Sequence, residues 1–196
     1  IINIILILLI LNIYIFVVLE QNLENNISEN SSIENSVIKD SNLESLEVEE
    51  KQYPKEDFED TFNGFEVCAK LEIPDISSEI SILAEYSEEA LNTSPTKFWG
   101  VDANQIGNFC VVGHNFINKN MFHDLKKLEI GDIFYIIDKN IGKVEYEIFN
   151  IYKVLPEDVS PLNTVTTNER EVTLITCTSD SKERIIVKAK EKISGG

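Results

Sequence analysis

The stretch between about Thr61 and Ile193 breaks into short runs of β-branched and aromatic residues, separated by Gly, Pro, Asn and Asp. Residues of the first kind favour strands, and the separators favour turns. About eight such runs at this spacing predict an all-β barrel or sandwich rather than a parallel α/β sheet. The clearest runs are "FEVCAKLEI", "EISILAEY", "NFCVVGH", "GDIFYIID", "GKVEYEIFNIYKVL", "EVTLITC" and "RIIVKAK".

Two short helices are expected among these strands. The first is "SEEALN", in which Ser87 is placed to cap the helix N-terminus. The second is "NMFHDLKKL", where Phe122, Leu125 and Leu128 recur every three residues. The expected fold is therefore all-β with short helices.

The first segment of the chain, "IINIILILLILNIYIFVVL" (residues 1–19), carries no charged side chain. As a helix it would span roughly 28 Å at about 1.5 Å per residue, close to the thickness of a bilayer core. A cleaved signal peptide is the alternative, but its apolar core is usually shorter and is followed by small residues, which are missing here. We therefore expect residues 1–19 to form a transmembrane helix that anchors the protein.

Residues 20–60 are rich in Asn and Ser and carry 13 acidic side chains against three lysines. Such a segment buries too little apolar surface to offset its ordering entropy. We expect a flexible acidic linker, with binding of a cationic partner as the less favoured alternative. The globular domain is then expected at residues 61–194.

Net charge and cysteine count exclude some classes of function. A net charge of −17 argues against a nucleic-acid partner, because no basic surface is present to neutralise phosphates. The three cysteines are an odd number, so at least one thiol has no intrachain disulfide partner, and Cys177 is the candidate. Cys68 and Cys110 show no C-x-x-C spacing, so a structural zinc site is unsupported. Whether these two form a disulfide is left open.

Four residues are candidates for chemistry, and each has an ordinary structural alternative. His114 follows a buried-looking run in "VVGHNF", where it is placed either to open into a cleft or to support the fold. His123 fits an ordinary helix-surface residue. Cys177 taken alone fits a buried core residue, and Arg184 taken alone fits a surface charge. Their combination in one chain favours a catalytic role.

That combination resembles the sortase family. "TLITC", with Arg184 seven residues after its cysteine, is similar to the sortase signature T-L-x-T-C with a downstream arginine. "GNFCVVGHNF" resembles the histidine segment of sortases, and "FHDLKKLEIGD" resembles the F-x-x-L-x-x-L-x-x-G-D that follows it. "LEIPDI" and "SPTKFWG" resemble two earlier segments in the family's order. The resemblance covers nearly all of residues 65–192.

The resemblance implies a closed, eight-stranded β-barrel and a membrane-tethered cysteine transpeptidase on the outer face of Gram-positive cells. Such enzymes cleave a C-terminal sorting motif similar to L-P-x-T-G in secreted proteins, and pass the acyl group to an amine of the cell wall or of a pilin. By match to the motif, Cys177 is the nucleophile, His114 the general acid and base, and Arg184 the oxyanion and substrate contact. Thr176 and Asn115 follow as weaker supporting residues.

Elementary chemistry agrees with these roles. A thiol attacks as thiolate, and a histidine can protonate the leaving amine. A guanidinium is always charged and presents several fixed donors, so it suits a developing oxyanion. If Cys177 ends one strand and Arg184 begins the next, a six-residue turn brings the two side chains together on one face.

The subclass, the cofactor and the alternatives follow from smaller features. The chain shows no second apolar segment after "KEKISGG" and no helical insertion in "LPEDVSPLNTVTTNERE", which favours a compact single-pass enzyme over a pilin polymerase. No cofactor is expected. A Ca²⁺ site is the disfavoured alternative to a solvated acidic loop, with candidate ligands Glu157, Asp158, Glu169 and Glu171. A cysteine endopeptidase and a catalytically inert exported binding module are the alternative functions.

Overall fold

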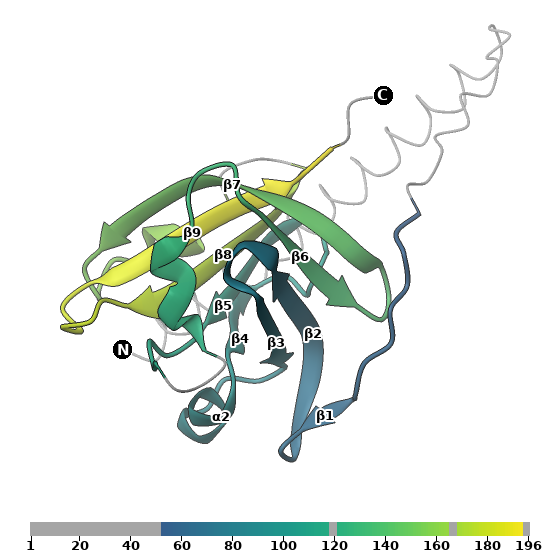
Figure 1. The fold of residues 1–196 in the computed structure, drawn as a ribbon, viewed down its shortest axis with the longest axis horizontal. Coiled ribbons are helices and arrows are strands. Elements are labelled where there is room, and N and C mark those ends of the chain that lie inside the picture. The colour runs from purple at the N-terminus through teal and green to yellow at the C-terminus, as the bar shows by residue number, and fades with distance from the viewer. Residues whose placement is uncertain (1–51, 118–120, 165–167, 194–196) are drawn as a thin grey trace, which may run out of the picture. The chain divides into compact units, whose positions relative to one another are not determined.

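The computed structural model describes residues 52–117, 121–164 and 168–193. This part of the chain is mostly β-strand, in agreement with the expected fold class (Figure 1). The strands are β1 (Thr61–Phe62), β2 (Phe65–Ile73), β3 (Ser78–Leu83), β4 (Thr96–Gly100), β5 (Gly107–Val112), β6 (Ile133–Asp138), β7 (Gly142–Val154), β8 (Arg170–Cys177) and β9 (Arg184–Glu191).

Eight of these strands close into a barrel. The order is β2-β3-β4-β5-β8-β9-β7-β6, and β6 pairs again with β2. Most neighbours are antiparallel, but β3 pairs with β4 and β5 pairs with β8 in parallel. The predicted eight-stranded barrel is therefore confirmed. The two-residue strand β1 is an addition that pairs only with the start of β2.

The alternation of the sequence explains the barrel wall. Along β2, Val67, Ala69, Leu71 and Ile73 are buried, whereas the residues between them are partly exposed. Period-two burial is the mark of a strand with one face on the core. The core is formed by inward-facing side chains from strands around the barrel, among them Ile82, Phe109, Val111, Phe134, Ile136, Val144, Tyr146, Ile148, Val172, Leu174 and Val187.

Both expected helices are present, and one is of a different type. The α-helix α2 (Glu88–Thr93) begins where Ser87 Oγ accepts a hydrogen bond from the backbone N of Ala90 at 3.0 Å. The second, η2 (Phe122–Lys127), is a 3-10 helix. Its apolar residues recur every three positions, and a 3-10 turn contains three residues, so this spacing puts Phe122 and Leu125 on one buried face. Two further 3-10 turns are η1 (Pro74–Ile76) and η3 (Ser160–Leu162).

Residues 52–60 were assigned to the flexible linker, but in the structure several of them contact the barrel. The backbone O of Pro54 accepts a hydrogen bond from the backbone N of Lys143 at 2.8 Å. Tyr53 packs against the main core cluster, and its hydroxyl donates to Glu191. Gly142, with φ +116°, allows this approach, since a Cβ there would lie 2.5 Å from the Pro54 O.

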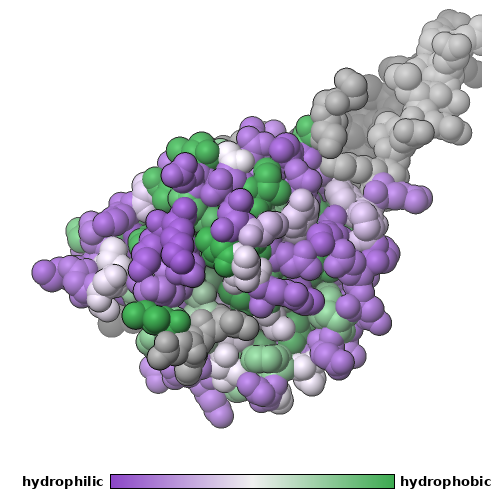
Figure 2. Space-filling model, in the orientation of Figure 1, coloured by the Kyte–Doolittle hydropathy of each residue, from purple (hydrophilic) through white to green (hydrophobic). Residues whose placement is uncertain are grey.

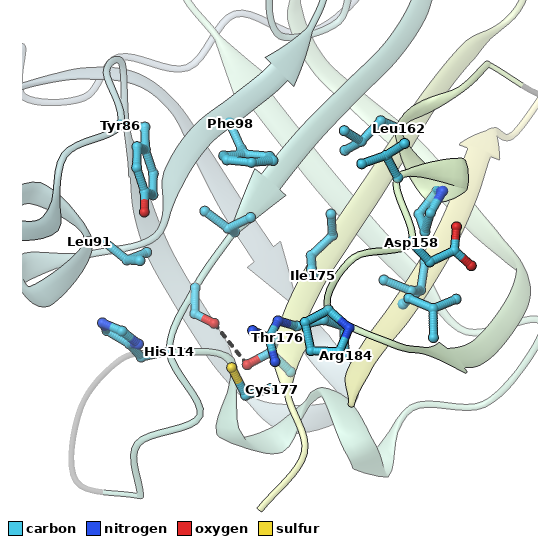
Figure 3. A pocket seen from close by; sticks show the side chains of 17 residues that line it. Tyr86, Leu91, Phe98, His114, Asp158, Leu162, Ile175, Thr176, Cys177 and Arg184 are labelled. Atoms are coloured by element: carbon cyan, nitrogen blue, oxygen red, sulfur yellow. Dashed lines mark hydrogen bonds between the residues drawn. The ribbon is translucent and has the colours of Figure 1, made fainter. Parts of the chain in front are cut away.

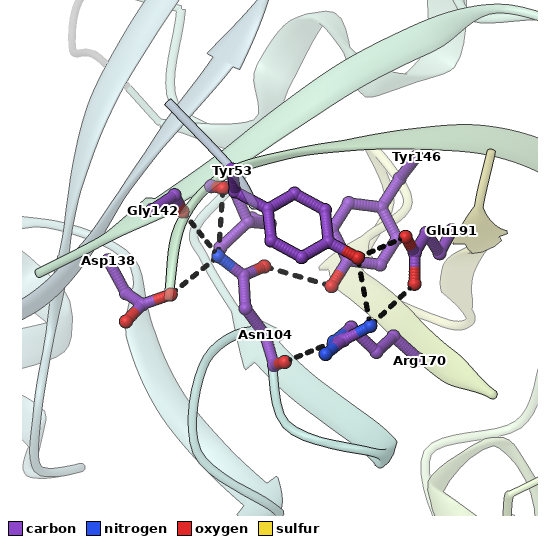
Figure 4. Close-up of polar contacts among 8 residues, drawn as sticks. Tyr53, Asn104, Asp138, Gly142, Tyr146, Arg170 and Glu191 are labelled. Carbon is purple, nitrogen blue, oxygen red and sulfur yellow. Dashed lines mark hydrogen bonds and ion pairs between the residues drawn. The ribbon is translucent and has the colours of Figure 1, made fainter. Parts of the chain in front are cut away.

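Tyr53 belongs to a polar network inside one end of the barrel (Figure 4). Arg170 Nη1 lies 2.7 Å from a carboxylate oxygen of Glu191 and 3.0 Å from the Tyr53 hydroxyl. The Arg170 Nε donates to the backbone O of Asn104, and the Tyr146 hydroxyl donates to Asn104 Oδ1 at 2.9 Å. This network explains Arg170 as a structural residue that ties residue 53 to strands β8 and β9.

The expected transmembrane helix at residues 1–19, and the linker as far as residue 51, lie outside the described residues. Within the part that is described, no helix is both long enough and apolar enough to span a membrane. The face of the domain drawn in Figure 2 is mostly hydrophilic, with smaller apolar areas between.

Candidate active site

Most of the predicted site residues line one cavity of about 410 Å³ (Figure 3). Cys177, His114, Arg184 and Thr176 all line it. In the view of Figure 3, Cys177 lies between His114 and Arg184. The remaining lining residues are mostly apolar: Tyr86, Leu91, Phe98, Val112, Gly113, Val154, Pro156, Asp158, Val159, Pro161, Leu162, Ile175 and Ile186.

The pair of strands β8 and β9 sets the positions of Cys177 and Arg184. Cys177 is the last residue of β8 and Arg184 the first of β9, and the two are direct partners in the antiparallel register. Directly opposed residues project to the same face of a sheet, with Cβ atoms about 4.5–5.5 Å apart. The predicted six-residue turn between them is confirmed.

The turn is held by its own side chains. Thr178 Oγ1 donates to Asp180 Oδ1 at 2.7 Å and accepts from the backbone N of Glu183 at 3.1 Å. Arg184 Nη1 lies within weak hydrogen-bonding distance of the backbone O of Glu183, at 3.3 Å, and of Ser181, at 3.4 Å. These contacts keep the Arg184 guanidinium beside the turn that joins β8 to β9.

The parallel register of β5 and β8 sets the height of His114. Val112, the last residue of β5, is the partner of Ile175, and the backbone N of Gly113 donates to the backbone O of Ile175 at 3.0 Å, so His114 follows the end of β5 at about the height of Cys177. Thr176 Oγ1 donates to the backbone O of Gly113 at 2.8 Å, which ties the ends of the two strands together (Figure 3).

Gly113 is required by close packing beneath the histidine loop. A Cβ at this position would lie 2.7 Å from Phe122 and 3.0 Å from Pro95. The backbone N of Phe122 in turn donates to the backbone O of His114 at 2.9 Å. The helix η2 therefore supports the segment that carries His114, and the His114 ring stacks on Phe116 with a centroid distance of 4.4 Å.

Asn115 contacts the backbone of Cys177, and His123 contacts Asn115. Asn115 Nδ2 donates to the backbone O of Cys177 at 2.8 Å. Asn115 Oδ1 lies 2.6 Å from His123 Nδ1, and Lys126 Nζ lies 3.0 Å from His123 Nε2. Because Oδ1 is an acceptor and a lysine ammonium is a donor, this arrangement requires a proton on Nδ1 and a lone pair on Nε2. Sequence reasoning treated His123 as a surface residue, and its position next to Asn115 was missed.

The other two cysteines lie in different surroundings. All three thiols are free, which answers the question of a Cys68–Cys110 disulfide. Burial raises the pKa of Cys68 to about 12 and that of Cys110 to about 11. Such thiols stay protonated at neutral pH and are poor nucleophiles. Cys177, partly exposed at the cavity, is therefore the thiol placed for chemistry.

The apolar walls of the cavity were not identified from the sequence. Tyr86 and Phe98 pack edge to face with a centroid distance of 5.5 Å, and in Figure 3 they lie across the cavity from Leu162 and Asp158. They come from the segment before α2 and from β4, whereas Leu162 comes from the loop between β7 and β8. Tyr86 ends the run "EISILAEY" and Phe98 lies in "SPTKFWG", but neither run shows which of its side chains face a cavity.

The carboxylates considered for Ca²⁺ do not converge. Asp158 accepts a hydrogen bond from the backbone N of Ser160 at 2.8 Å on the rim of the cavity. Glu171 is buried in the barrel wall, with Oε2 3.8 Å from Lys188 Nζ. Among the residues that the structure describes, no group of three or more His, Cys, Asp or Glu side chains is arranged to hold a metal ion.

A closed barrel that brings a cysteine, a histidine and an arginine to one mostly apolar cavity has the arrangement of a cysteine-dependent active site. The family model of the Sortase domain matches residues 71–192, and the chain belongs to the sortase family. The sortase resemblance noted in the sequence is thereby confirmed.

The chain is also similar to individual sortases. It is 30% identical over 128 residues to Sortase A of Bacillus anthracis, a match that covers 62% of this chain and 58% of that protein's length. Its fold is similar to Sortase A from Corynebacterium diphtheriae, lid mutant, with a TM-score of 0.61 and 26% identity over 67% of this chain and 73% of the other. A Clostridium perfringens Sortase D5 transpeptidase gives a TM-score of 0.60 and 29% identity over 65% and 80%.

Proposed function

We propose that this protein is a membrane-anchored transpeptidase that cleaves an LPxTG-like C-terminal sorting motif of secreted proteins and transfers the acyl group to a cell-wall peptide amine. The observation that carries the proposal is the placement of Cys177 opposite Arg184 and level with His114 in one cavity. The chain's membership of a family of cysteine transpeptidases supports the same reaction class.

The first half-reaction assigns one task to each side chain. The Cys177 sulfur, as thiolate, attacks the carbonyl carbon of the residue before the scissile bond. Arg184 donates to the oxyanion that forms, which lowers the energy of the tetrahedral intermediate. When the C–N bond breaks, His114 supplies the proton that the leaving amine needs, and the acyl group remains on sulfur as a thioester.

The second half-reaction reverses these roles with a new nucleophile. His114, now neutral, takes a proton from the incoming amine, whose nitrogen attacks the thioester carbon. The C–S bond breaks, and Cys177 leaves as thiolate. In this proposal Thr176 and Asn115 act by position, because Thr176 holds the end of β5 to β8 and Asn115 holds the Cys177 carbonyl.

The cavity suits an extended peptide with apolar side chains. Tyr86 and Phe98 form one wall, Leu162 contributes to the other, and Ile175 lies between them (Figure 3). Val159 also lines the cavity. Burying apolar peptide groups here removes apolar surface from water, which favours binding. The acidic balance of the chain makes nucleic acid an unfavourable partner.

We further propose that residues 1–19 anchor the enzyme in the membrane as a single pass, with the catalytic domain outside the cell and an acidic linker between. Its partners are then secreted proteins with a sorting signal and peptides of the cell-wall precursor. The proposal assigns it to the compact type that anchors individual proteins, and it uses no cofactor, since Cys177, His114 and Arg184 supply every proton and charge the two half-reactions need.

The test is the fate of the acyl-enzyme. A sorting-motif peptide is incubated with the enzyme while an amine, from oligoglycine to a diaminopimelate-containing peptide, is titrated in, and products are measured by mass spectrometry. Transpeptidation predicts that ligated product replaces hydrolysed product as the amine rises. Hydrolysis alone with every amine would instead identify a cysteine endopeptidase. Peptide binding without any turnover, unchanged after Cys177 is alkylated, would identify an inert binding module.

A further inference from the structure

Four polar side chains are buried in the barrel wall behind the cavity. Lys188 of β9 and Asn108 of β5 are each 2% exposed, Glu171 of β8 is 1% exposed, and Thr173 of β8 is 0% exposed. Buried polar groups are costly unless they are paired, so each needs a partner that explains its presence. None of the four lines the cavity or belongs to the proposed reaction.

Two of these side chains donate to the same loop. Lys188 Nζ donates to the backbone O of Asn163 at 2.9 Å. Asn108 Nδ2 lies 3.2 Å from the backbone O of Pro161, 3.2 Å from that of Leu162 and 3.3 Å from that of Asn163. The Lys188 ammonium and the Asn108 amide thus contact three consecutive carbonyls of the loop between β7 and β8.

The other two side chains orient the donors. Thr173 Oγ1 donates to Asn108 Oδ1 at 2.8 Å, which turns the amide NH₂ toward the loop. Glu171 Oε2 lies 3.8 Å from Lys188 Nζ and balances its charge. Burial lowers the pKa of Lys188, and the nearby Glu171 opposes that effect.

Stability of the barrel alone does not explain this cluster. A buried ion pair is often no better than apolar residues of the same volume, because two charges lose their hydration. The contacts of this one lead outward to a loop, and the loop carries Val159, Pro161 and Leu162, which line the cavity. A fixed loop also binds a peptide without an ordering cost.

We propose that Lys188 and Asn108 are positioning residues that hold Pro161–Asn163 as a preformed wall of the peptide groove. Thr173 and Glu171 orient them. The kinetic part of this inference rests on the proposed transpeptidase function, whereas the anchoring of the loop does not. The wall is held by side chains of the barrel itself.

The first experiment compares two buried threonines. Thr173→Val removes the hydroxyl that orients Asn108. Thr96→Val removes the hydroxyl of another threonine at 0% exposure, whose oxygen has no hydrogen-bond partner within the described structure. Both changes are nearly isosteric, so the pair separates loss of the contact from loss of a hydroxyl. Asn108→Ala removes the loop contacts directly.

The second experiment addresses the ammonium. Lys188→Met combined with Glu171→Gln removes the donor without leaving an unpaired buried carboxylate. Glu171→Gln alone keeps the Lys188 ammonium for the Asn163 carbonyl and should change both readouts less than the double variant does. Two readouts are taken on each variant: steady-state kinetics on a sorting-motif peptide, and cleavage by a Glu-specific protease after Glu157 in the loop. Cleavage after Glu129, in a different loop, is the internal reference.

The inference predicts the same result for Thr173→Val, Asn108→Ala and the double variant. Each should raise KM about tenfold with a smaller change in kcat. Each should also speed cleavage after Glu157 about tenfold relative to cleavage after Glu129. Thr96→Val should stay within about twofold of wild type in both. Unchanged cleavage and KM in a folded Thr173→Val or Asn108→Ala protein would overturn it. If wild type shows no turnover of any peptide, the proposed function fails, and the protease readout still decides whether the loop is anchored.

Discussion

Cys177 and Arg184 face one another as the last pair of the antiparallel ladder between β8 and β9. The thiol and the guanidinium are thereby placed on one face of the sheet by backbone hydrogen bonds and not by a direct contact between them. A rigid ladder of this kind keeps a charge-stabilising group beside a nucleophile before substrate arrives.

The geometry predicts different outcomes for Arg184→Lys and Cys177→Ala. Cys177→Ala should abolish turnover of a sorting-motif peptide with no loss of fold, because the side chain is only half-buried. Arg184→Lys should lower kcat/KM by about 10²-fold or more, since an ammonium cannot reproduce the planar fork of donors. Peptide kinetics and circular dichroism measure both. Cys110→Ala is the control, and activity lost there while Cys177→Ala stays active would reverse the assignment.

The histidines should differ in the size of their effect. His114→Ala should lower kcat by about 10²–10⁴-fold, as expected for loss of a general acid and base. His123→Ala should cost less, about tenfold in kcat, because it removes only the partner that orients Asn115. His123→Asn places an N–H close to the former Nδ1 and should recover most of that loss. An inactive His123→Asn beside an active His123→Ala would contradict this positioning role.

Thiol reactivity should separate Cys177 from the other two cysteines. At pH 8 an alkylating reagent should add to the native protein once, at Cys177, because burial holds the pKa of Cys68 at about 12 and of Cys110 at about 11. Intact mass and peptide mapping check this. Rapid double or triple modification of the native protein would show that the buried thiols are accessible.

The same raised pKa predicts a pH dependence of stability. Above the ordinary thiol pKa of 9.0 the unfolded chain loses its Cys68 proton, whereas the folded protein keeps it up to about pH 12. The stability that the folded protein gains by keeping Cys68 protonated is therefore complete below pH 9. It is lost as pH rises toward 12, by at most about 1.4 kcal/mol per pH unit. Denaturant unfolding of wild type and Cys68→Ala at pH 8, 9 and 10 measures it. The difference in free energy of unfolding should shrink with pH, and a constant difference would contradict the assignment.

Residues 52–60 should matter for stability and not for catalysis. A fragment that begins at residue 52 keeps the Tyr53 contacts with Glu191 and Arg170, whereas one that begins at residue 61 loses them. Tyr53→Phe should lower the free energy of unfolding by about 1 kcal/mol. The fragment that begins at residue 61 should lose more than that relative to the fragment that begins at residue 52. No residue of 52–60 lines the cavity, so kcat/KM of the folded fragments should agree. Equal unfolding midpoints for both fragments would show that the contacts contribute nothing.

The sequence by itself determined most of the strands and the set of reactive side chains. Strand runs such as Phe65–Ile73 carry period-two burial in their own residues, and the turn from Cys177 to Arg184 is local, so both are readable from neighbours along the chain. Strand β4 is harder, because its five residues include only one that is fully buried. Residues 52–60 look like a linker by composition, which does not reveal the contacts of Tyr53, Pro54 and Phe58 with the barrel.

The tertiary structure decided which distant residues meet. Lys188 of β9 reaches Asn163, and Asn108 of β5 reaches Pro161, and no local pattern connects these residues. The register of β5 with β8 set the height of His114, and the closure of β2 on β6 is a pairing of residues more than sixty positions apart. Local preferences act over a few residues, whereas these contacts depend on how the whole barrel buries its apolar surface, so the groove walls and their supports exist only once the chain has folded.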